Sequence, residues 1–325
     1  APLSQDRSYA DFAASQFNSI TPENEMKWET IHPAQTVYNF SPAETIVSFA
    51  SAHGQMVRGH TLLWHSQNPA WVTQAAWTCE EARAVLQDHI TTVVGHFRGE
   101  IYQWDVANEI FHDPWDQGGV RLRIDQNPFL RACAEDPVAL IEDAFRWAHE
   151  ADPGAVLFLN DYNVEGINAK SDAYYALAQQ MLADGVPLGG FGLQAHLGLQ
   201  YGFDTSLQDN MKRFDALGLQ TSITEADVRM PTYGQDNPSE EQLAEQAARY
   251  GALLQACLDV PGCHSFTVWG FSDRYSWVPG TFAGQDWATI TTRDGSLKPA
   301  YWTLLDLLTD ATPGRSPRHD MGHWR

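Results

Sequence analysis

The sequence predicts a single-domain (β/α)₈ (TIM) barrel. Short apolar runs alternate along the chain with longer stretches whose apolar residues recur with a period near 3.6. Strand, helix and strand at this spacing pair in parallel through right-handed crossovers. The 325-residue length suits one barrel of this kind. Neither G-x-G-x-x-G nor G-x-x-x-x-G-K-[ST] occurs in the sequence, which argues against an open nucleotide-binding sheet.

The expected elements follow each other in order. The predicted strands are Phe17–Thr21, Met56–Trp64, Ile101–Glu109, Val156–Tyr162, Gly190–His196, Gln220–Ala226 and Ser265–Phe271. The clearest helical stretches between them are Glu80–Phe97, Val138–Ala151, Ala169–Ala183 and Glu240–Leu258. We expect the barrel domain to cover residues 1–311. Residues 312–325, rich in Pro, Gly, Arg and His, then form a C-terminal tail.

Charge and hydropathy exclude some classes of partner. The chain has 20 basic and 41 acidic side chains, a formal net charge of −21. Such a charge argues against binding to nucleic acid or to an anionic membrane surface. No stretch approaches the roughly 18 consecutive apolar residues of a membrane span. The sequence begins Ala1-Pro2-Leu3, with neither a basic nor an apolar leader region, so we expect no uncleaved signal peptide.

The four cysteines allow two disulfides. Cys257 and Cys263 flank a turn-rich segment, and a bridge between them would close a short loop and contribute about 2 kcal/mol. The alternative is two unrelated buried thiols. A bridge would indicate an oxidising, extracellular setting. Cys79 and Cys133 could also pair, but the sequence alone leaves this open.

Polar side chains follow the apolar part of each predicted strand. Because the carboxyl ends of parallel barrel strands meet on one face, where barrel enzymes carry out their chemistry, we expect these side chains to converge there. An even scatter of polar residues over the loops is the alternative. The residues are His60, Trp64, Asn108, Glu109, Asn160, Asp161, Asn163, Gln194, His196, Glu225, Asp227 and Asp273.

Two of these residues are glutamates embedded in apolar strands. Burying Glu109 and Glu225 costs desolvation unless they are hydrogen-bonded or functional, although either alone could cap a helix or form a salt bridge. They would lie on the fourth and seventh strands if one strand preceded Phe17. Opposed carboxyl groups are the apparatus for cleaving a glycosidic bond.

The number and the positions of the tryptophans indicate a sugar substrate. The chain has 12 tryptophans, and several lie beside the polar strand ends. Aromatic rings stack on the apolar faces of sugars, whereas some tryptophans must simply fill the core. Those beside the strand ends are Trp28, Trp64, Trp71, Trp104, Trp269 and Trp277.

Seven motifs in order resemble glycoside hydrolase family 10, the retaining endo-β-1,4-xylanases. The similarity extends from about residue 3 to residue 308. The motifs are Ile20–Trp28, Gly59–Gln67, Trp104–Glu109, Asn160–Asn163, Gly192–His196, Ile223–Asp227 and Val268–Asp273.

The resemblance implies a role for each matching residue. Glu109 corresponds to the acid/base and Glu225 to the nucleophile. Asn108 would hold the sugar 2-hydroxyl, and His196, with Asp227 behind it, would orient the nucleophile. Gln194 would lie near the acid/base, and Tyr162 and Asn163 toward the aglycone. The glycone-binding positions are Glu23, Asn24, Lys27, His60, Trp64, Gln67, Trp269 and Trp277.

The resemblance also implies the Cys257–Cys263 disulfide and no metal or other cofactor. It points to a secreted, monomeric endo-1,4-β-xylanase that hydrolyses internal xylan bonds with retention and binds xylan and xylooligosaccharides. Action on another β-glycoside, such as a cellooligosaccharide or a glycoalkaloid, is the nearest alternative. A metal-dependent barrel hydrolase is disfavoured because no H-E-x-x-H occurs, and a non-catalytic sugar-binding protein because both glutamates are present.

Three features depart from the family pattern. The strand that normally precedes the segment beginning at Leu3 is missing, so either the tail around Asp320–Arg325 fills its place or the barrel stays imperfectly closed. The segment Asp113–Glu135, which would cover the aglycone side, is longer than usual and differs in sequence from the family's usual segment. Ala107 replaces the more usual Val, a change of core volume to which we assign no function.

Overall fold

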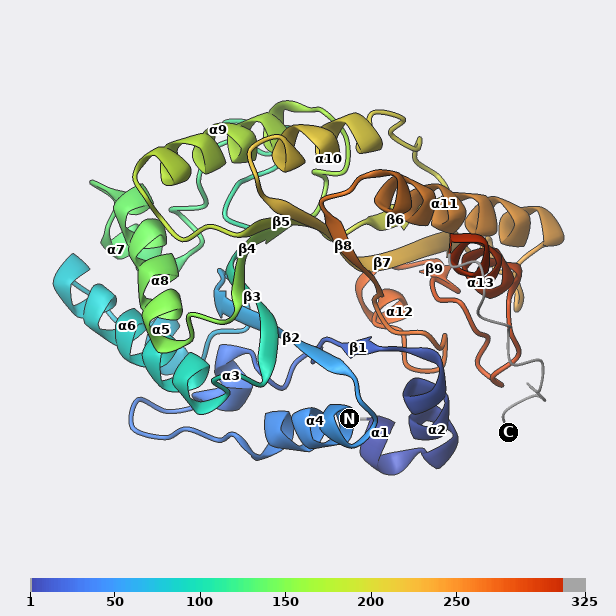
Figure 1. Ribbon diagram of the computed structural model, residues 1–325, viewed down its shortest axis with the longest axis horizontal. Coiled ribbons are helices and arrows are strands. Elements are labelled where there is room, and N and C mark those ends of the chain that lie inside the picture. Colours follow the sequence, from blue (N-terminus) through green and yellow to red (C-terminus); the bar gives the residue numbers. More distant parts are fainter. Residues whose placement is uncertain (1, 312–325) are drawn as a thin grey trace.

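The computed structural model describes residues 2–311, which form a parallel β-barrel surrounded by helices (Figure 1). The strands of the barrel are adjacent in the order in which they occur along the chain. They are β1 (Ser19–Ile20), β2 (Met56–Leu63), β3 (Ile101–Asn108), β4 (Val156–Asp161), β5 (Gly190–Leu193), β7 (Gln220–Pro231) and β8 (Cys263–Val268).

Helices on the outside of the barrel bury apolar side chains against the strands. The longer ones are α2 (Arg7–Gln16), α4 (Ser41–Ala52), α6 (Cys79–His96), α8 (Pro137–Ala151), α9 (Ala169–Ala183), α10 (Leu207–Asp215), α11 (Glu240–Asp259) and α13 (Pro299–Ala311). Shorter ones are α1 (Pro2–Gln5), α3 (Trp28–Ile31), α5 (Ala70–Thr73), α7 (Pro128–Ala132) and α12 (Val278–Thr281).

The four predicted helices are confirmed to within one residue at each end. Local sequence explains this agreement, because capping boxes mark the start of three of them. Thr78 and Glu81 cap α6, Asn168 and Ser171 cap α9, and Ser239 caps α11 together with Gln242.

All seven predicted strands form, but three end more than one residue from the predicted position. Strand β8 ends at Val268, three residues before the predicted end at Phe271. Strand β5 ends at Leu193, and His196 begins a separate strand, β6 (His196–Gly198). Strand β7 continues five residues beyond the predicted end at Ala226, to Pro231. Its second half pairs in parallel with β6 and antiparallel with β9 (Gln285–Asp286), and this non-local pairing was not visible in the local pattern.

The barrel has one open seam. Within residues 2–311, β8 pairs with β7 and β1 with β2, but no ladder joins β8 to β1. Aromatic rings occupy this place: Phe271 stacks on Tyr9 and Phe12 at centroid distances of 4.1 and 5.0 Å and lies 5.4 Å from Phe17. The expected absence of one barrel strand is therefore confirmed, and the barrel is nearly closed.

The tail proposed to fill this seam lies outside the described residues, as does the whole predicted segment 312–325. Among the described helices, none combines the length and apolar character needed to cross a membrane.

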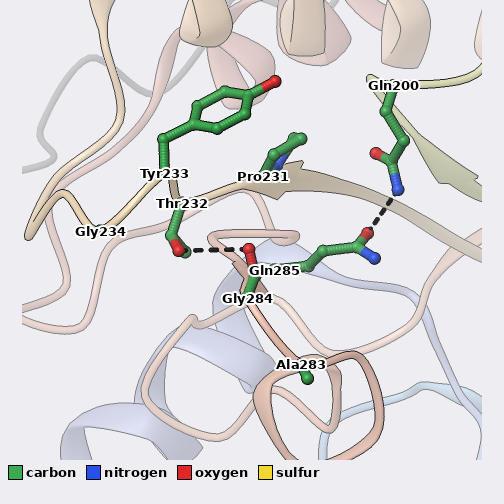
Figure 2. A pocket seen from close by; sticks show the side chains of 8 residues that line it. All are labelled: Gln200, Pro231, Thr232, Tyr233, Gly234, Ala283, Gly284 and Gln285. Carbon is green, nitrogen blue, oxygen red and sulfur yellow. Dashed lines mark hydrogen bonds between the residues drawn. The ribbon is translucent and has the colours of Figure 1, made fainter.

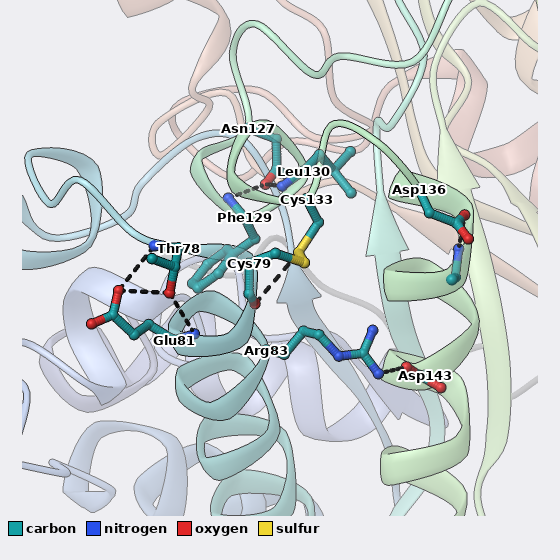
Figure 3. The surroundings of a disulfide bond; sticks show 11 residues. Thr78, Cys79, Glu81, Arg83, Asn127, Phe129, Leu130, Cys133, Asp136 and Asp143 are labelled. Atoms are coloured by element: carbon teal, nitrogen blue, oxygen red, sulfur yellow. Dashed lines mark hydrogen bonds and ion pairs between the residues drawn. A yellow bond between two sulfur atoms is a disulfide. The ribbon is translucent and has the colours of Figure 1, made fainter.

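All four cysteines are paired. Cys257 and Cys263 join the end of α11 to the start of β8, as the family resemblance implied. Cys79 and Cys133, whose pairing the sequence left open, form the second disulfide, with a Cα–Cα distance of 4.6 Å (Figure 3). This bond ties the first residue of α6 to the segment that follows α7. It thereby anchors the unusual loop Asp113–Glu135 to the barrel.

Candidate active site

The first glutamate of the predicted pair directly follows β3. Glu109 has a φ of +54°, in the left-handed region, and its backbone N–H donates to the Asn160 carbonyl at the end of β4 (2.9 Å). Three donors hold its carboxyl group. Trp64 Nε1 donates to Oε2 (2.8 Å), while Gln194 Nε2 and Asn108 Nδ2 donate to Oε1 (3.0 and 3.3 Å).

The second glutamate lies within β7 and is only 4% exposed. Asn160 Nδ2 donates to Glu225 Oε1 (2.8 Å), and His196 Nε2 lies 3.2 Å from Glu225 Oε2. Burial by itself would raise the pKa of this carboxyl group. The hydrogen bond from His196 and the electrostatic effects of His60 and His196 outweigh it and hold the Glu225 pKa below its usual range.

His196 connects Glu225 to a second carboxylate. Its Nδ1 lies 2.8 Å from Asp227 Oδ2, which also accepts a hydrogen bond from Trp277 Nε1 (2.8 Å). Burial would lower the pKa of His196, but the charge of Asp227 and the hydrogen bonds to Asp227 and Glu225 raise that pKa to about 10. His196 is therefore protonated at neutral pH and donates to both carboxylates.

Amide side chains link the two glutamates. Asn108 Oδ1 accepts from Asn160 Nδ2 (2.9 Å) and from Gln194 Nε2 (3.3 Å). Gln194 also binds Glu109, and Asn160 also binds Glu225, so a continuous hydrogen-bonded chain runs from one carboxyl group to the other.

Asn160 was expected at the barrel mouth, but its bridging role was not predicted. Its Oδ1 accepts from the Thr224 hydroxyl (2.7 Å), which fixes the direction of the amide toward Glu225. The sequence signals were an asparagine at the end of an apolar strand and its place in the motif Asn160–Asn163, from which no role for it was inferred.

A second polar group lies around Lys27, near Trp64 and Glu109. Lys27 Nζ donates to Gln67 Oε1 (2.7 Å) and Asn24 Oδ1 (3.4 Å), and lies 4.8 Å from the centre of the Trp64 ring. Burial lowers the pKa of Lys27, against the opposing effect of Glu225 and other carboxylates. Glu23 is exposed on the same loop after β1.

The orientation of His60, on β2, is held by residues of β2 and of the neighbouring strand β3. Its Nδ1 lies 2.9 Å from Asp105 Oδ2 on β3, and the guanidinium of Arg58 binds the same carboxylate. Trp269 packs edge-on against the imidazole at 5.4 Å. Arg58 and Asp105 were not predicted as part of the site, although charged residues inside an apolar strand were the available signal.

Tyr162 and Asn163 follow β4 and are held by the loop Asp113–Glu135 and helix α9. The Tyr162 hydroxyl accepts from Arg123 (2.7 Å), and Lys170 Nζ lies 3.9 Å from its ring centre. Asn163 Nδ2 donates to Asp113 Oδ1 (3.1 Å). Arg123 and Lys170 are buried supports that the sequence reasoning missed.

Buried and half-buried acid, base and amide groups thus converge at the carboxyl ends of β3, β4 and β5 and at the middle of β7. One carboxyl group is held ionised by a protonated histidine, and the other is held by three neutral donors. This arrangement suits a nucleophile paired with a proton donor. Within residues 2–311, no group of three or more His, Cys, Asp or Glu side chains is arranged to hold a metal ion.

Comparison with known proteins is consistent with this geometry. The sequence profile described as Glycosyl hydrolase family 10 matches residues 1–307. Endo-1,4-beta-xylanase B of Thermotoga neapolitana is 42% identical over 305 residues, covering 93% of this chain and 84% of that protein. The endo-1,4-beta-xylanase of Agaricus bisporus is 37% identical over 292 residues, with coverages of 90% and 83%.

Solved structures of other proteins also resemble this chain in fold and in sequence. Xylanase 10B of Thermotoga petrophila RKU-1, in complex with xylobiose, superposes with a TM-score of 0.86 at 41% identity and covers 95% of this chain and 90% of that one. Native xylanase 10B of Thermotoga maritima has a TM-score of 0.87 at 42% identity, with coverages of 95% and 91%.

Proposed function

Because the chain belongs to glycosyl hydrolase family 10, we propose that it is a retaining endo-1,4-β-xylanase that hydrolyses internal bonds of xylan. Relatives that match most of its length carry the name endo-1,4-beta-xylanase, and one related structure contains xylobiose. The observation that carries the proposal is the pair of carboxyl groups joined through Asn108, with Glu225 held ionised by His196.

In the first step, a Glu225 oxygen attacks the anomeric carbon of the xylose at the cleavage point. The bond from that carbon to the leaving oxygen breaks, and protonated Glu109 transfers its proton to that oxygen. The product is a covalent glycosyl-enzyme. A direct attack requires the two carboxyl groups to lie about 5–5.5 Å apart.

In the second step, Glu109 accepts a proton from water while the water oxygen attacks the same carbon. The bond to Glu225 breaks, so the carboxylate is regenerated and the sugar leaves with its original configuration. Asn108 binds the 2-hydroxyl beside the nucleophile, and Trp64 and Gln194 hold Glu109 in place through both steps.

The remaining predicted residues have positioning and binding roles in this proposal. Lys27, Asn24, Gln67 and Glu23 bind the glycone, with Trp64, Trp269, Trp277 and His60 around the ring. Tyr162 and Asn163 contact the aglycone, and Asp227 keeps His196 charged. The support is their convergence at the carboxyl ends of the barrel strands.

Two variants and one product analysis test the mechanism. We expect Glu225→Gln and Glu109→Gln each to lower kcat on xylan by about 10³-fold or more. Glu100→Gln, which changes an exposed glutamate at the opposite end of β3, is the matched control and should keep full activity. Proton NMR of the first products should show the β-anomer. An α-anomer, or near-normal turnover by Glu225→Gln, would refute the assignment.

Substrate class is tested by measuring reducing-sugar release from xylan and from carboxymethylcellulose. Higher activity on cellulose would overturn the assignment of xylan. Activity that a chelator abolishes would contradict the proposal that catalysis needs no cofactor.

We also propose that the protein works outside the cell, as a monomer, and binds neither nucleic acid nor membranes. Two disulfides support an oxidising compartment, and a net charge of −21 disfavours anionic polymers and surfaces. Size-exclusion chromatography with light scattering should give one chain, of 36.3 kDa.

A further inference from the structure

A hollow of about 500 Å³ lies at the carboxyl end of β7, and Figure 2 shows the eight residues that line it. It is formed where β7 ends, beside the residues that follow β6 and those that begin β9. Its size is within the usual range for binding pockets of small molecules. None of the residues assigned above to catalysis or to sugar binding lines it.

The hollow has a prominent aromatic wall. Tyr233 is 79% exposed and has a φ of +49°, a left-handed conformation that is costly for an aromatic residue. The preceding residue is pinned, because the Thr232 N–H and hydroxyl both donate to the Gly284 carbonyl (2.8 and 3.1 Å). A backbone that is pinned at Thr232 therefore holds a largely exposed tyrosine ring beside the hollow.

Two amides supply polar groups with a set orientation. Gln285 Oε1 accepts from Gln200 Nε2 (2.7 Å) and from Arg229 Nε (3.0 Å). Among residues 2–311, no hydrogen-bond partner is found for Gln285 Nε2 or for Gln200 Oε1. One donor and one acceptor are thus left for a ligand, in fixed positions relative to the tyrosine.

The lining carries no charged side chain, although the chain contains 41 acidic residues. Arg229, which donates to Gln285, is 8% exposed, and its guanidinium lies 4.0 Å from the centre of the Phe282 ring. An aromatic face, an amide donor, an amide acceptor and no charge fit a neutral sugar, whose ring face is apolar and whose edge carries hydroxyls.

Two contacts connect the surroundings of the hollow with residues assigned to the candidate active site. Arg229 donates to the carbonyls of His196 and Leu197 (3.0 and 3.2 Å), and Phe282 packs edge-on against Trp277 at 5.3 Å. Along β7, Pro231 follows Glu225 by six residues, which is at most about 20 Å of extended strand. A polysaccharide chain can span this distance.

We propose that this hollow is a second carbohydrate-binding site, which holds a stretch of neutral β-linked polysaccharide away from the bond being cleaved. Tyr233 stacks on one sugar ring, and Gln200 and Gln285 bind its hydroxyls. The identity of the sugar as xylan rests on the proposed function. The site then increases the affinity for polymeric xylan and does not act on short substrates that fill only the catalytic cleft.

The experiment compares a long and a short substrate. Tyr233→Ala removes the stacking ring. Ala283→Trp leaves Tyr233 in place and fills the hollow with a large side chain. Both should raise KM for polymeric xylan about threefold to tenfold with kcat unchanged, and should leave kcat/KM for an aryl β-xylobioside unchanged. Trp302→Ala, which removes an exposed tryptophan on α13, is the matched control and should change neither. A wild-type KM on polymeric xylan in both test variants would overturn the proposal. An equal loss of kcat/KM on polymeric xylan and on the aryl β-xylobioside would overturn it too.

Affinity electrophoresis separates this proposal from the proposed function. The inactive Glu225→Gln protein is run in gels with and without xylan, with Tyr233 intact or replaced by Ala. Weaker retardation when Tyr233 is replaced supports the site, whether or not the wild-type protein hydrolyses xylan. Equal retardation with and without Tyr233 would refute it.

Discussion

At the residue scale, two glutamates with the same side chain have different surroundings. Glu225 is buried beside a protonated imidazole, and its pKa is lowered. Glu109 is bound by an indole, a glutamine and an asparagine, all of which are neutral donors. The difference in partners supports the proposed roles, with Glu225 as the nucleophile and Glu109 as the group that transfers the proton.

His196 is the residue through which this difference can be tested. Replacing it with Gln removes the charge that favours ionised Glu225, so the Glu225 pKa should rise. The acid limb of the kcat/KM profile on an aryl β-xylobioside should therefore move to higher pH. His53→Gln, which changes an exposed histidine after α4, is the control. An unmoved acid limb in the His196 variant would contradict the assigned role.

The same variant has a second readout, in stability. The folded-state pKa of His196 is raised from 6.5 to about 10. The protonated form therefore contributes stability in full below about pH 6.5, and this contribution is lost as the pH rises through about 10. Urea denaturation should show a stability deficit for the variant that is largest at about pH 6.5 and below, shrinks as the pH rises from about 6.5 and disappears above about pH 10.

At the element scale, backbone conformation at the strand ends turns the functional side chains inward. Gln67, Glu109, Asn163 and Ala195 follow β2, β3, β4 and β5 within four residues, and each has a positive φ between 47° and 61°. A non-glycine residue in this region costs about 1–3 kcal/mol and persists where the surrounding structure holds it. Such residues concentrate here at the ends of strands, where the chain must leave the barrel and still present a polar group.

The two disulfides should contribute unequally to stability. The Cys79–Cys133 bond spans 54 residues and the Cys257–Cys263 bond only 6. In the chain-entropy account, removing the first pair by Cys→Ser changes costs about 4 kcal/mol, and removing the second about 2 kcal/mol. Urea denaturation of the two double variants measures both. Equal losses, or a larger loss for the short loop, would contradict the prediction.

At the scale of the whole molecule, the assigned site is complete within the described part of the chain. Helix α13 ends at Ala311, and every hydrogen bond assigned to the site joins residues within 2–311. We expect a chain truncated after Ala311 to keep wild-type kcat on xylan and to melt within about 2 °C of the full-length protein. A clear fall in melting temperature would instead favour the tail as the occupant of the seam between β8 and β1.

How much of this structure can be predicted from the sequence depends on how far apart along the chain the interacting residues are. Predicted strands such as Met56–Trp64 and helices such as Ala169–Ala183 agree with the structure, because apolar periodicity and capping residues are local properties. The resemblance of seven ordered motifs identified Glu109, Glu225 and their partners. Direct hydrogen bonds between many of these residues are consistent with that identification.

By itself, the sequence determined the alternation of strands and helices, the family, and which polar residues end the strands. Only the tertiary structure decided that Asn160 bridges the two halves of the site, that Arg58 and Asp105 hold His60, that Cys79 pairs with Cys133 and that aromatic rings fill the seam. The physical reason is distance along the chain. Each of these contacts joins residues tens to hundreds of positions apart, which become neighbours only when the barrel forms.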